Sequence, residues 1–558
     1  MSCGFFYTFQ LKLNHHMNRF LLSTLTSFLF LALSCTSSTK EAGAAANTKD
    51  TIPTIKKAVA SSMAGNFSTQ SELRFDSAAI KDFLKKYPDF NKFSKDLNKF
   101  YQSRSFSYAW YDGNGLIEQA ASLYNRVEQL QEEGITRQLP YSKTFDALMD
   151  DNDSLLLREP MNAEAELMLT SQYFAYANIA WEGIDEKETQ KLDWFLPRKK
   201  LSLKNLMDSL ISEEGKTILE KEPVYYQYAL LREYLKKYKT LEKNGGYPKI
   251  TADKKSYKLG DSSNTIKTIR KSLYLMNDLT TPDTLSHVMD ATLESAVKKF
   301  QLRHGWKDDG IIGAAMIREM NIPVHERILQ LLVNMERCRW VPVDSKKDYI
   351  MINIPAYKLY VVENDSVAWN MNVVVGKSMH KTAIFNGDLK HVVFSPYWNV
   401  PPSILKNEII PGIKRNPNYL KNHNMEWNGN GVRQKPGNNN SLGQVKFLFP
   451  NSFNIYLHDT PAKSLFSEDQ RAFSHGCIRL SEPRKLATYL LRNDKNWNDA
   501  SITEAMNAGK EKYVTLAKTV PVFIAYLTAW VDRAGELQFR NDIYNRDNRL
   551  AEMILTKE

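Results

Sequence analysis

The sequence predicts a multidomain α+β protein with an N-terminal α-helical scaffold, a small three-helix module and a mainly β domain. Its 558 residues are enough for roughly three to four domains. Apolar residues recur at helical spacing over about 70–245, and again in shorter runs over 257–320. From about residue 348 the pattern changes to alternating β-branched and aromatic residues, which is typical of strands.

Composition narrows the class of protein. With 43% hydrophobic and 11% aromatic residues, the chain can bury sizeable cores, which excludes a chain that is disordered throughout. The net charge of +11 suits anionic partners. No lysine or arginine block dominates and no nucleic-acid motif is present, so we expect no nucleic-acid partner and a basic, solvated surface.

The first 35 residues are typical of an export signal. "MNRFLLSTLTSFLFLALSC" begins at Met17 with one arginine, runs apolar from Phe20 to Leu33 and ends at Cys35. The apolar run is too short for a comfortable transmembrane helix. A cysteine at the cleavage point resembles a bacterial lipoprotein signal in which Cys35 is lipidated, although Ala32 stands where leucine is usual. The alternative is an ordinary signal peptide cleaved nearby.

A tether and a helical region follow this signal of residues 1–35. Residues 36–70 are assigned to a flexible tether, because "TSSTKEAGAAANTKDT" is small and polar. A helical scaffold is expected over 71–248, and the turn residues of "NGGYPKIT" mark its end. Its helical patterns cover 80–102, 116–135, 163–182, 201–221 and 225–242.

Residues 255–322 hold helical patterns at 264–276 and 290–303 and a third short helix. The second pattern ends in "FQLRHGWKDDGIIG", where Gly310 and Gly313 fit tight turns. This segment resembles the peptidoglycan-binding type 1 domain, a three-helix module, and the resemblance implies wall binding. A generic helical linker is the alternative. The matching residues are Ala296, Phe300, Gln301, Gly305, Asp309, Gly310 and Gly313.

A linker helix is expected over 323–347, where the apolar stripe of "VHERILQLLVNMERCRWVP" includes Cys338. This pattern favours a buried, inert thiol. If the mature chain starts at Cys35, Cys338 and Cys477 are the two remaining thiols. They could pair in an exported protein, but a large domain does not need a disulfide, and a lone thiol then calls for a function.

The mainly β domain is expected over 348–530, followed by a C-terminal tail at 531–558. A helical insertion near 403–425 and a helix at 482–492 interrupt the strands. The irregular, Asn-rich loop 432–443 is of a kind that often forms a lid or a binding element. The strand-like runs are "YIMINIPAYKLYVVEND", "VAWNMNVVVGK", 391–401, 444–450, 453–459 and 520–531.

Candidate chemistry concentrates in "FSHGCIRL" (473–480) and in His458, near the end of the run "FNIYLHD". A free thiol has a pKa of about 8.5, but a nearby imidazole can take its proton and later protonate a leaving amine. Gly476 leaves room beside the Cys477 sulfur, and the N–H groups of these two residues could hold an oxyanion. Losing one such donor costs roughly 3–4 kcal/mol. Sequence alone does not decide whether His458 or His475 is the base.

The pattern "HDTP…FSHGCIRL" resembles the motif of the L,D-transpeptidases, the YkuD-type catalytic domain. The resemblance implies that Cys477 is the nucleophile and His458 the general base, with the Asp459 carbonyl orienting the base and His475 shaping the site. "PYWNVPPSI" and "RQKPGNNNSLGQVKFLFPN" resemble the larger periplasmic subgroup, which joins a scaffold, a peptidoglycan-binding module and the catalytic domain in this order. The motif residues are His458, Asp459, Thr460, Pro461, Ser474, His475, Gly476, Cys477, Ile478 and Arg479.

Four residues are candidates for contacting substrate, and each has a structural alternative. Arg479 has a forked guanidinium that binds carboxylates, or it forms a structural ion pair. Ser474 hydrogen-bonds near the thiol, or it caps the loop. Tyr397 and Trp398 line a groove for the donor, or they belong to the core.

The resemblance implies acyl transfer in peptidoglycan. Cys477 would attack a donor tetrapeptide stem, expel its terminal D-alanine and pass the acyl group to an amine of a neighbouring stem, giving a 3→3 cross-link. A lid at about 403–435 would favour the amine by excluding water. No cofactor is expected. The implied partners are peptidoglycan and, through the lipid anchor, a membrane facing the periplasm of a diderm bacterium.

Three other hypotheses stay open. An L,D-carboxypeptidase on the same fold would trim stems with water. His458, His475 and Cys477 are residue types that bind zinc, but no CxxC or HxxxH pair accompanies them, so we expect no metal. The third hypothesis is a wall-binding lipoprotein with an inert catalytic domain, and the intact histidine and cysteine argue against it.

Overall fold

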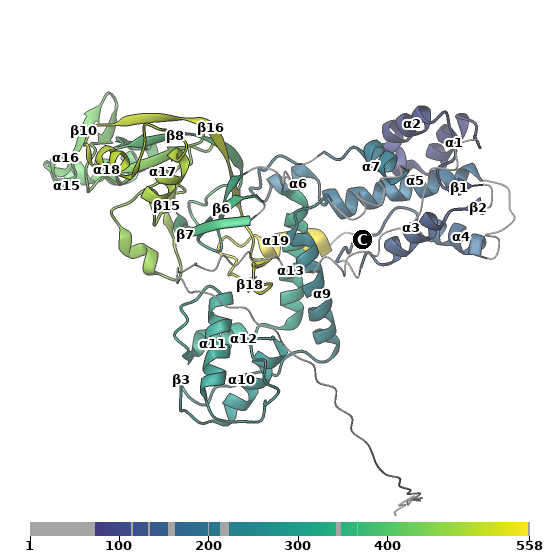
Figure 1. Ribbon diagram of the computed structural model, residues 1–558, viewed down its shortest axis with the longest axis horizontal. Helices are drawn as coiled ribbons and strands as arrows, with labels where there is room; N and C mark the ends of the chain where they lie inside the picture. The colour runs from purple at the N-terminus through teal and green to yellow at the C-terminus, as the bar shows by residue number, and fades with distance from the viewer. Residues whose placement is uncertain are drawn as a thin grey trace, which may run out of the picture. The chain divides into compact units, whose positions relative to one another are not determined.

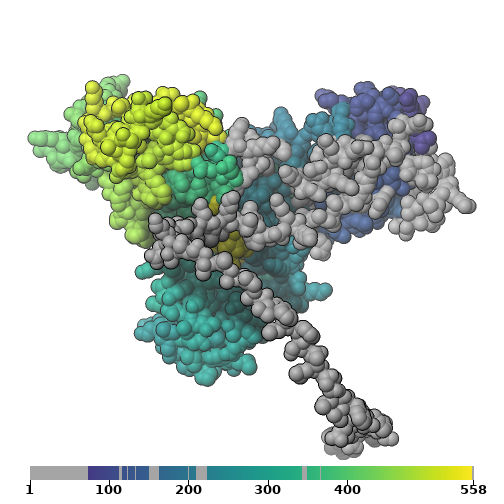
Figure 2. All heavy atoms as spheres, in the orientation of Figure 1, coloured from purple at the N-terminus to yellow at the C-terminus, as the bar shows by residue number. Residues whose placement is uncertain are grey.

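The computed structural model describes residues 73–112, 115–131, 134–153, 162–198, 200–211, 223–341, 348–364 and 366–555, which are coloured in Figures 1 and 2. The predicted signal at 1–35, with Cys35, and the predicted tether at 36–70 lie outside these described residues. Within the described ranges, no helix is both long and apolar enough to cross a membrane.

Helices dominate the N-terminal region, as the apolar spacing predicts (Figure 1). The pattern at 80–102 is split, because Pro88 lacks the N–H that a continuous helix needs. A small hairpin joins β1 (Tyr111–Asp112) and β2 (Gly115–Leu116). The helices are α1 (Ala78–Lys86), η2 (Pro88–Phe93), α2 (Ser94–Ser103), α3 (Glu118–Glu128), α4 (Ser142–Asp153), α5 (Ala163–Ala177), η3 (Asn178–Glu182), α6 (Glu186–Gln190), α7 (Leu203–Ile211) and α9 (Gln227–Lys243).

Helix α5 carries one carboxylate into this helical core. Glu166 is fully buried, and both of its oxygens accept hydrogen bonds. Oε1 accepts from the Ala109 N–H and the Tyr101 hydroxyl, each at 2.7 Å, and Oε2 accepts from the Trp110 N–H at 3.0 Å. Burial raises the pKa of Glu166 to about 7, although these hydrogen bonds act in the opposite direction.

The predicted three-helix module is confirmed, and it has a core of its own. Two short strands, β3 (Ser256–Tyr257) and β4 (Ile312–Gly313), pair beside the helices. Gly310 has φ +72°, a conformation that favours glycine, so it serves as the tight turn that the sequence predicts. The helices are α10 (Asn264–Leu275), α11 (Ala291–Arg303) and α12 (Ala314–Met320).

Helix α13 (Val324–Trp340) packs along α9 and contributes to a core shared with the β domain. Its Cys338 is fully buried, and burial raises the pKa of the thiol to about 12. Cys338 therefore acts as a small hydrophobic residue. It is not paired with Cys477, since both cysteines are free thiols.

A nine-stranded sheet forms the β domain, in the order β14-β7-β15-β13-β12-β8-β16-β5-β6. An additional pairing of β7 with β6 closes the sheet on itself. Strand β13 runs parallel to β15, which matters for the site below. The strands are β5 (Tyr349–Asn353), β6 (Lys358–Glu363), β7 (Ser366–Gly376), β8 (Asn386–Phe394), β12 (Val445–Leu448), β13 (Leu457–His458), β14 (Ala472–Ser474), β15 (Ile478–Leu480) and β16 (Lys512–Ala525).

The insertion between β8 and β12 folds around its own small core, made by Val400, Ile409, Met425 and Val432. Helical turns occupy the segment where a helical insertion is predicted, and a three-stranded sheet pairs β10 and β11, which follow them, with β9, which precedes them. The elements are β9 (Trp398–Asn399), α14 (Pro402–Ile404), η4 (Leu405–Ile409), α15 (Ile410–Arg415), α16 (Tyr419–Asn422), β10 (Met425–Asn428) and β11 (Gly431–Gln434).

The C-terminal segment is folded as far as Leu555, whereas the sequence predicts a tail at 531–558. Strand β17 (Ala529–Val531) pairs with β18 (Leu537–Phe539), and α19 (Asp547–Leu555) packs against α13. These elements are short, so their order depends on packing rather than on local pattern. Two helices precede them, α17 (Pro483–Leu491), where a helix is predicted, and α18 (Asp499–Asn507).

Candidate active site

Two parallel strands bring the motif residues together. His458 ends β13, and Cys477 directly precedes β15. In the parallel register Leu457 lies opposite Ile478, and His458 lies opposite Arg479. Cys477 stands two residues before Arg479, so the thiol and the imidazole lie diagonally across two adjacent strands, on the same face.

His458 is buried and held in one tautomer. Its Nδ1 lies 2.5 Å from the carbonyl oxygen of Asp459. Because a carbonyl accepts and cannot donate, Nδ1 carries the proton and Nε2 presents a lone pair. Burial, and then the charge of Arg479, lower the pKa of His458 to about 3. The imidazole is thus neutral at physiological pH and able to accept a proton.

Asp459 is fixed by its own contacts. Its carboxylate accepts from the N–H of Thr460 at 2.7 Å, the N–H of Gln444 at 2.9 Å and Nζ of Lys463 at 2.5 Å. Gly443, with φ +61°, allows this approach, since a Cβ there would lie 2.3 Å from the carboxylate. These contacts set the direction of the carbonyl that orients His458.

The Cys477 thiol is a half-buried free cysteine. Its Sγ lies 3.7 Å from the carbonyl oxygen of Asn454, to which the thiol donates. Burial raises the pKa of the thiol, whereas the backbone and side chain of Tyr456 and the charge of Arg479 lower it. The resting group is therefore a protonated thiol rather than a stable thiolate.

Ser474 closes the loop of residues 474–477, which carries the thiol. Its hydroxyl donates to the carbonyl of Cys477 at 2.5 Å and accepts from the N–H of Gly476 at 3.1 Å. Ser474 thus caps the loop, and the Gly476 N–H, one of the two expected oxyanion donors, is already engaged. Among the described residues, the N–H of Cys477 has no recorded partner and stays available. Gly476 has φ +115°, which favours glycine.

Hydrogen bonds from Thr382 and Tyr544 support the loop of residues 474–477. The Thr382 hydroxyl donates to the Gly476 carbonyl at 2.8 Å and accepts from the Gly376 N–H at 3.0 Å. Tyr544 donates to the Gly376 carbonyl at 2.5 Å and accepts from the Thr382 N–H at 3.2 Å. Tyr544 comes from the segment predicted to be a tail, so the C-terminus supports the site.

Arg479 is half-buried and makes no ion pair with any described residue. Its Nε is buried without a hydrogen-bond partner. Burial lowers the pKa of Arg479, and the nearby Cys477 acts in the opposite direction. The structural ion pair is therefore not formed, and the guanidinium remains available to an anion.

The second motif histidine has a different environment. His475 is half-exposed, and its Nε2 lies 3.2 Å from Oε1 of Glu408 in the insertion. Its ring also lies 5.0 Å from that of His380. Burial is the largest cause that lowers the pKa of His475, and Glu408 opposes it. His475 therefore joins the loop to the insertion.

Tyr397 and Trp398 lie apart from the thiol contacts. Tyr397 packs under the guanidinium of Arg433, 4.3 Å from the ring centre, and its N–H donates to Glu511 at 2.9 Å. Trp398 packs against the core of the insertion. Among the described residues, no contact joins either aromatic ring to Cys477, and the groove role of both stays a prediction.

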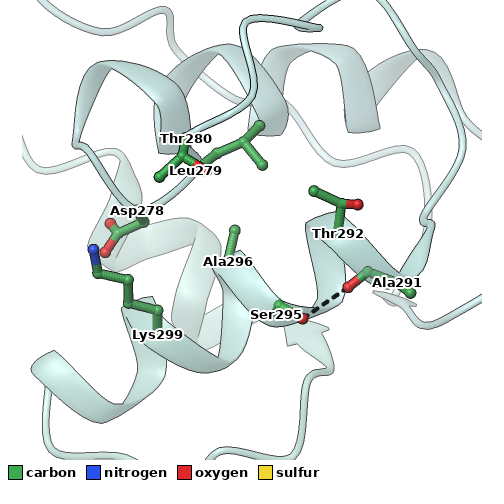
Figure 3. Close-up of a pocket in the computed structure, with 8 residues that line it drawn as sticks. All are labelled: Asp278, Leu279, Thr280, Ala291, Thr292, Ser295, Ala296 and Lys299. Carbon is green, nitrogen blue, oxygen red and sulfur yellow. Dashed lines mark hydrogen bonds between the residues drawn. The ribbon is translucent and has the colours of Figure 1, made fainter. Parts of the chain in front are cut away.

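A separate cavity of about 460 Å³ lies in the three-helix module, between α11 and the loop residues 278–280 that follow α10 (Figure 3). Lys299 and Asp278 stand at one end of it (Figure 3). Both are engaged, because Asp278 pairs with Arg303 at 2.5 Å and Lys299 with Glu536 at 2.9 Å. In the part of the chain that the structure describes, no cluster of three metal-ligating side chains occurs.

Sequence reasoning missed the groups around the motif. Thr382, Tyr544 and Asn454 carry no local signal, because only the fold brings them to the loop. Tyr456 was accessible to pattern analysis, since residues two apart on a strand share a face and Tyr456 precedes His458 by two.

Three family models match the chain. They are the L,D-transpeptidase catalytic domain (YkuD) at 347–504, a scaffold domain at 95–235 and a putative peptidoglycan binding domain at 262–320. A putative L,D-transpeptidase from Haemophilus influenzae is 31% identical over 242 residues, which cover 40% of this chain and 48% of that protein. The chain thus spans about half the length of this curated relative.

Solved structures of L,D-transpeptidases are also similar to the chain. The enzyme from Mycobacterium smegmatis is 15% identical, covers 32% of this chain and 58% of its own, and has a TM-score of 0.19. That from Xylanimonas cellulosilytica is 13% identical, covers 49% of this chain and 100% of its own, and has a TM-score of 0.17.

The family matches, with the closed sheet described above, define a chain that carries an L,D-transpeptidase catalytic domain of the YkuD family. More particularly, the chain joins this domain to a scaffold domain and a peptidoglycan-binding domain, the combination that the sequence motifs predict.

Proposed function

We propose that this chain is a cysteine-dependent L,D-transpeptidase that forms 3→3 cross-links between peptidoglycan stem peptides. The observation that carries the proposal is the parallel pairing of β13 with β15. In this pairing the strand that ends at His458, with its neutral and oriented imidazole, lies next to the strand that directly follows the free thiol of Cys477. The catalytic-domain match supports acyl transfer, and the peptidoglycan-binding match supports this polymer as substrate. Both support a cell-envelope location.

The proposed reaction has two balanced steps. In the first, Cys477 Sγ forms a bond to the carbonyl carbon of the third stem residue, and the bond to the terminal D-alanine nitrogen breaks. The thiol proton passes through Nε2 of His458 to that nitrogen. In the second, a neighbouring stem's amine forms a C–N bond, the thioester C–S bond breaks, and the amine proton returns through His458 to the sulfur.

Two features support transfer of a peptide acyl group over other uses of the thiol. The guanidinium of Arg479, whose Nε has no partner among the described residues, fits a carboxylate of the donor stem. The N–H of Cys477, for which the described residues offer no acceptor, fits the oxyanion. The insertion, which contacts the loop through Glu408 and His475, fits a lid that excludes water. Exclusion of water favours an amine acceptor over hydrolysis.

We also propose that the chain is anchored by a lipid on Cys35 and reaches the wall through the tether 36–70. The proposal rests on the signal pattern that ends at Cys35. Such an anchor would hold the enzyme in the periplasm at a membrane surface.

The proposal is tested with purified protein and a disaccharide-tetrapeptide. We expect cross-linked dimers with release of D-alanine from the unchanged chain, and neither product from Cys477→Ala. Formation of tripeptide without dimers would indicate a carboxypeptidase. If no product forms, the chain would be a wall-binding protein without this activity. Intact mass after exposure to a carbapenem should show one adduct, which Cys477→Ala should lack.

A further inference from the structure

A short turn leads the chain into β13 and passes directly beside the sulfur. It covers residues 451–456, between β12 and β13. The carbonyl of Asn454 accepts from the Cys477 thiol at 3.7 Å. The next contact comes from Tyr456, whose carbonyl accepts the N–H of Ile478 at 3.2 Å. The turn therefore continues the parallel pairing one residue beyond the strands.

Asn451 builds this turn. Its Oδ1 accepts from the N–H groups of Phe453 at 3.0 Å and Ile455 at 3.2 Å. Its Nδ2 donates to the carbonyls of Phe449 at 2.6 Å and Ile455 at 2.8 Å. One side chain thus makes four hydrogen bonds to the backbone around it, which holds the following Tyr456 in a defined position.

The position of Tyr456 follows from the strand register. Leu457 pairs with Ile478, so Tyr456 stands across from Cys477. Tyr456 also lies on the same face as His458, because residues two apart share a face, and the two ring centres are 5.7 Å apart. Tyr456 therefore stands beside Cys477 on the neighbouring strand, with His458 next to it on the same face.

Negative charge that develops on the Cys477 sulfur needs a hydrogen-bond donor beside it. Partial burial raises the pKa of the Cys477 thiol, and the buried His458 resists becoming an imidazolium beside the positive charge of Arg479. A stable thiolate–imidazolium pair is thus disfavoured, and other groups have to stabilise negative charge on sulfur. Tyr456 and the charge of Arg479 both lower the pKa of the Cys477 thiol, and Tyr456 stands across from Cys477 in the strand register.

We propose that the Tyr456 hydroxyl is a catalytic hydrogen-bond donor to the Cys477 sulfur as the thiol gives its proton to His458. The phenol keeps its own proton throughout, so no bond to it forms or breaks beyond this hydrogen bond. Contacts of this kind tighten as the reacting state forms. The inference rests on the proposed function, in which Cys477 is the nucleophile.

The test is the pH dependence of Cys477 alkylation by iodoacetamide, followed by the mass of the peptide that carries Cys477. Tyr456→Phe removes the hydroxyl and keeps the ring. We expect the midpoint of the curve of alkylation rate against pH to rise by about one pH unit, and alkylation at pH 7 to slow roughly tenfold. This is the effect of losing one hydrogen bond to a charged group. The matched control is Tyr489→Phe, because the Tyr489 hydroxyl bonds Glu363 and not the thiol, so the midpoint of Cys477 alkylation should not move.

A second variant guards against a folding defect. Replacing Tyr456 with 3-fluorotyrosine keeps the shape and makes the phenol a stronger donor, so the midpoint should fall. An unchanged midpoint in both variants would overturn the inference about Tyr456. Failure of the proposed function is distinguishable, because it is measured on the tetrapeptide substrate: the unchanged chain would then form no dimers, or Cys477→Ala would still form them, whatever the alkylation midpoint of Tyr456→Phe.

Discussion

Nδ1 of His458 lies 2.5 Å from the carbonyl oxygen of Asp459, the next residue along the chain. The imidazole is therefore oriented by a backbone group rather than by a carboxylate. That backbone group is itself held, because the Asp459 side chain accepts from Thr460, Gln444 and Lys463. A neutral acceptor suits a base that is already deprotonated at rest, since it fixes the tautomer without adding a negative charge.

The two motif histidines should differ sharply in their importance. We expect His458→Gln to reduce D-alanine release from the tetrapeptide by about 10²–10⁴-fold, the usual contribution of a general base. His475→Gln should keep most of the rate, because His475 is half-exposed and bonds Glu408. Equal losses in the two variants would contradict the assignment of His458 as the base.

The hydrogen bonds of Thr382 to the loop of residues 474–477 should affect both the stability of the protein and the rate of the proposed reaction. Thr382→Val leaves the Gly476 carbonyl and the Gly376 N–H without their partner, and both are buried. We expect a loss of about 1–3 kcal/mol in the free energy of unfolding and a fall in kcat larger than any change in KM. Thermal unfolding and steady-state kinetics measure these, with Thr503→Val on α18 as control. A stability loss with unchanged kcat would show that the network is only structural.

The contact between the insertion and the loop should control the choice of acceptor. Glu408→Ala removes the partner of His475, so the insertion should close less well and admit water. We expect the share of tripeptide over dimer to rise several-fold, measured by product mass. Lys406→Ala, an exposed neighbour on η4, is the control. An unchanged product ratio would argue against a lid.

The buried carboxylate of α5 should make stability depend on pH. The pKa of Glu166 is raised to about 7 from 4.5, so the folded state holds a proton that the unfolded state has lost in this window. The protonated Glu166 contributes fully to the free energy of unfolding below pH 4.5. This contribution is lost as the pH rises through 7, and the total loss is about 3 kcal/mol. Urea unfolding at pH 5 and pH 8 should show this decline, and Glu166→Gln should lack it. The exposed Glu242→Gln on α9 should behave like the unchanged chain.

Local patterns determined most elements but not their ends. The spacing of apolar residues predicted α5, α9 and α13, because each of these helices buries a long apolar face. The same spacing predicted one continuous helix across Pro88, where the structure has two α-helices, and it did not predict α4 or α18. The short β17, β18 and α19 were expected to be a tail, since elements of this length gain their stability from packing on α13 rather than from local preference.

By itself, the sequence determined the order of the domains, the chemical types in the motif and the burial of Cys338, because these follow from spacing and composition along the chain. Only the tertiary structure decided which histidine lies on the strand beside Cys477, that Ser474 closes the loop, and that Tyr544 supports it from the C-terminal segment. The physical reason is that hydrogen bonds and strand pairing act over a few ångströms in space. Residues that meet at that range can lie anywhere in the chain.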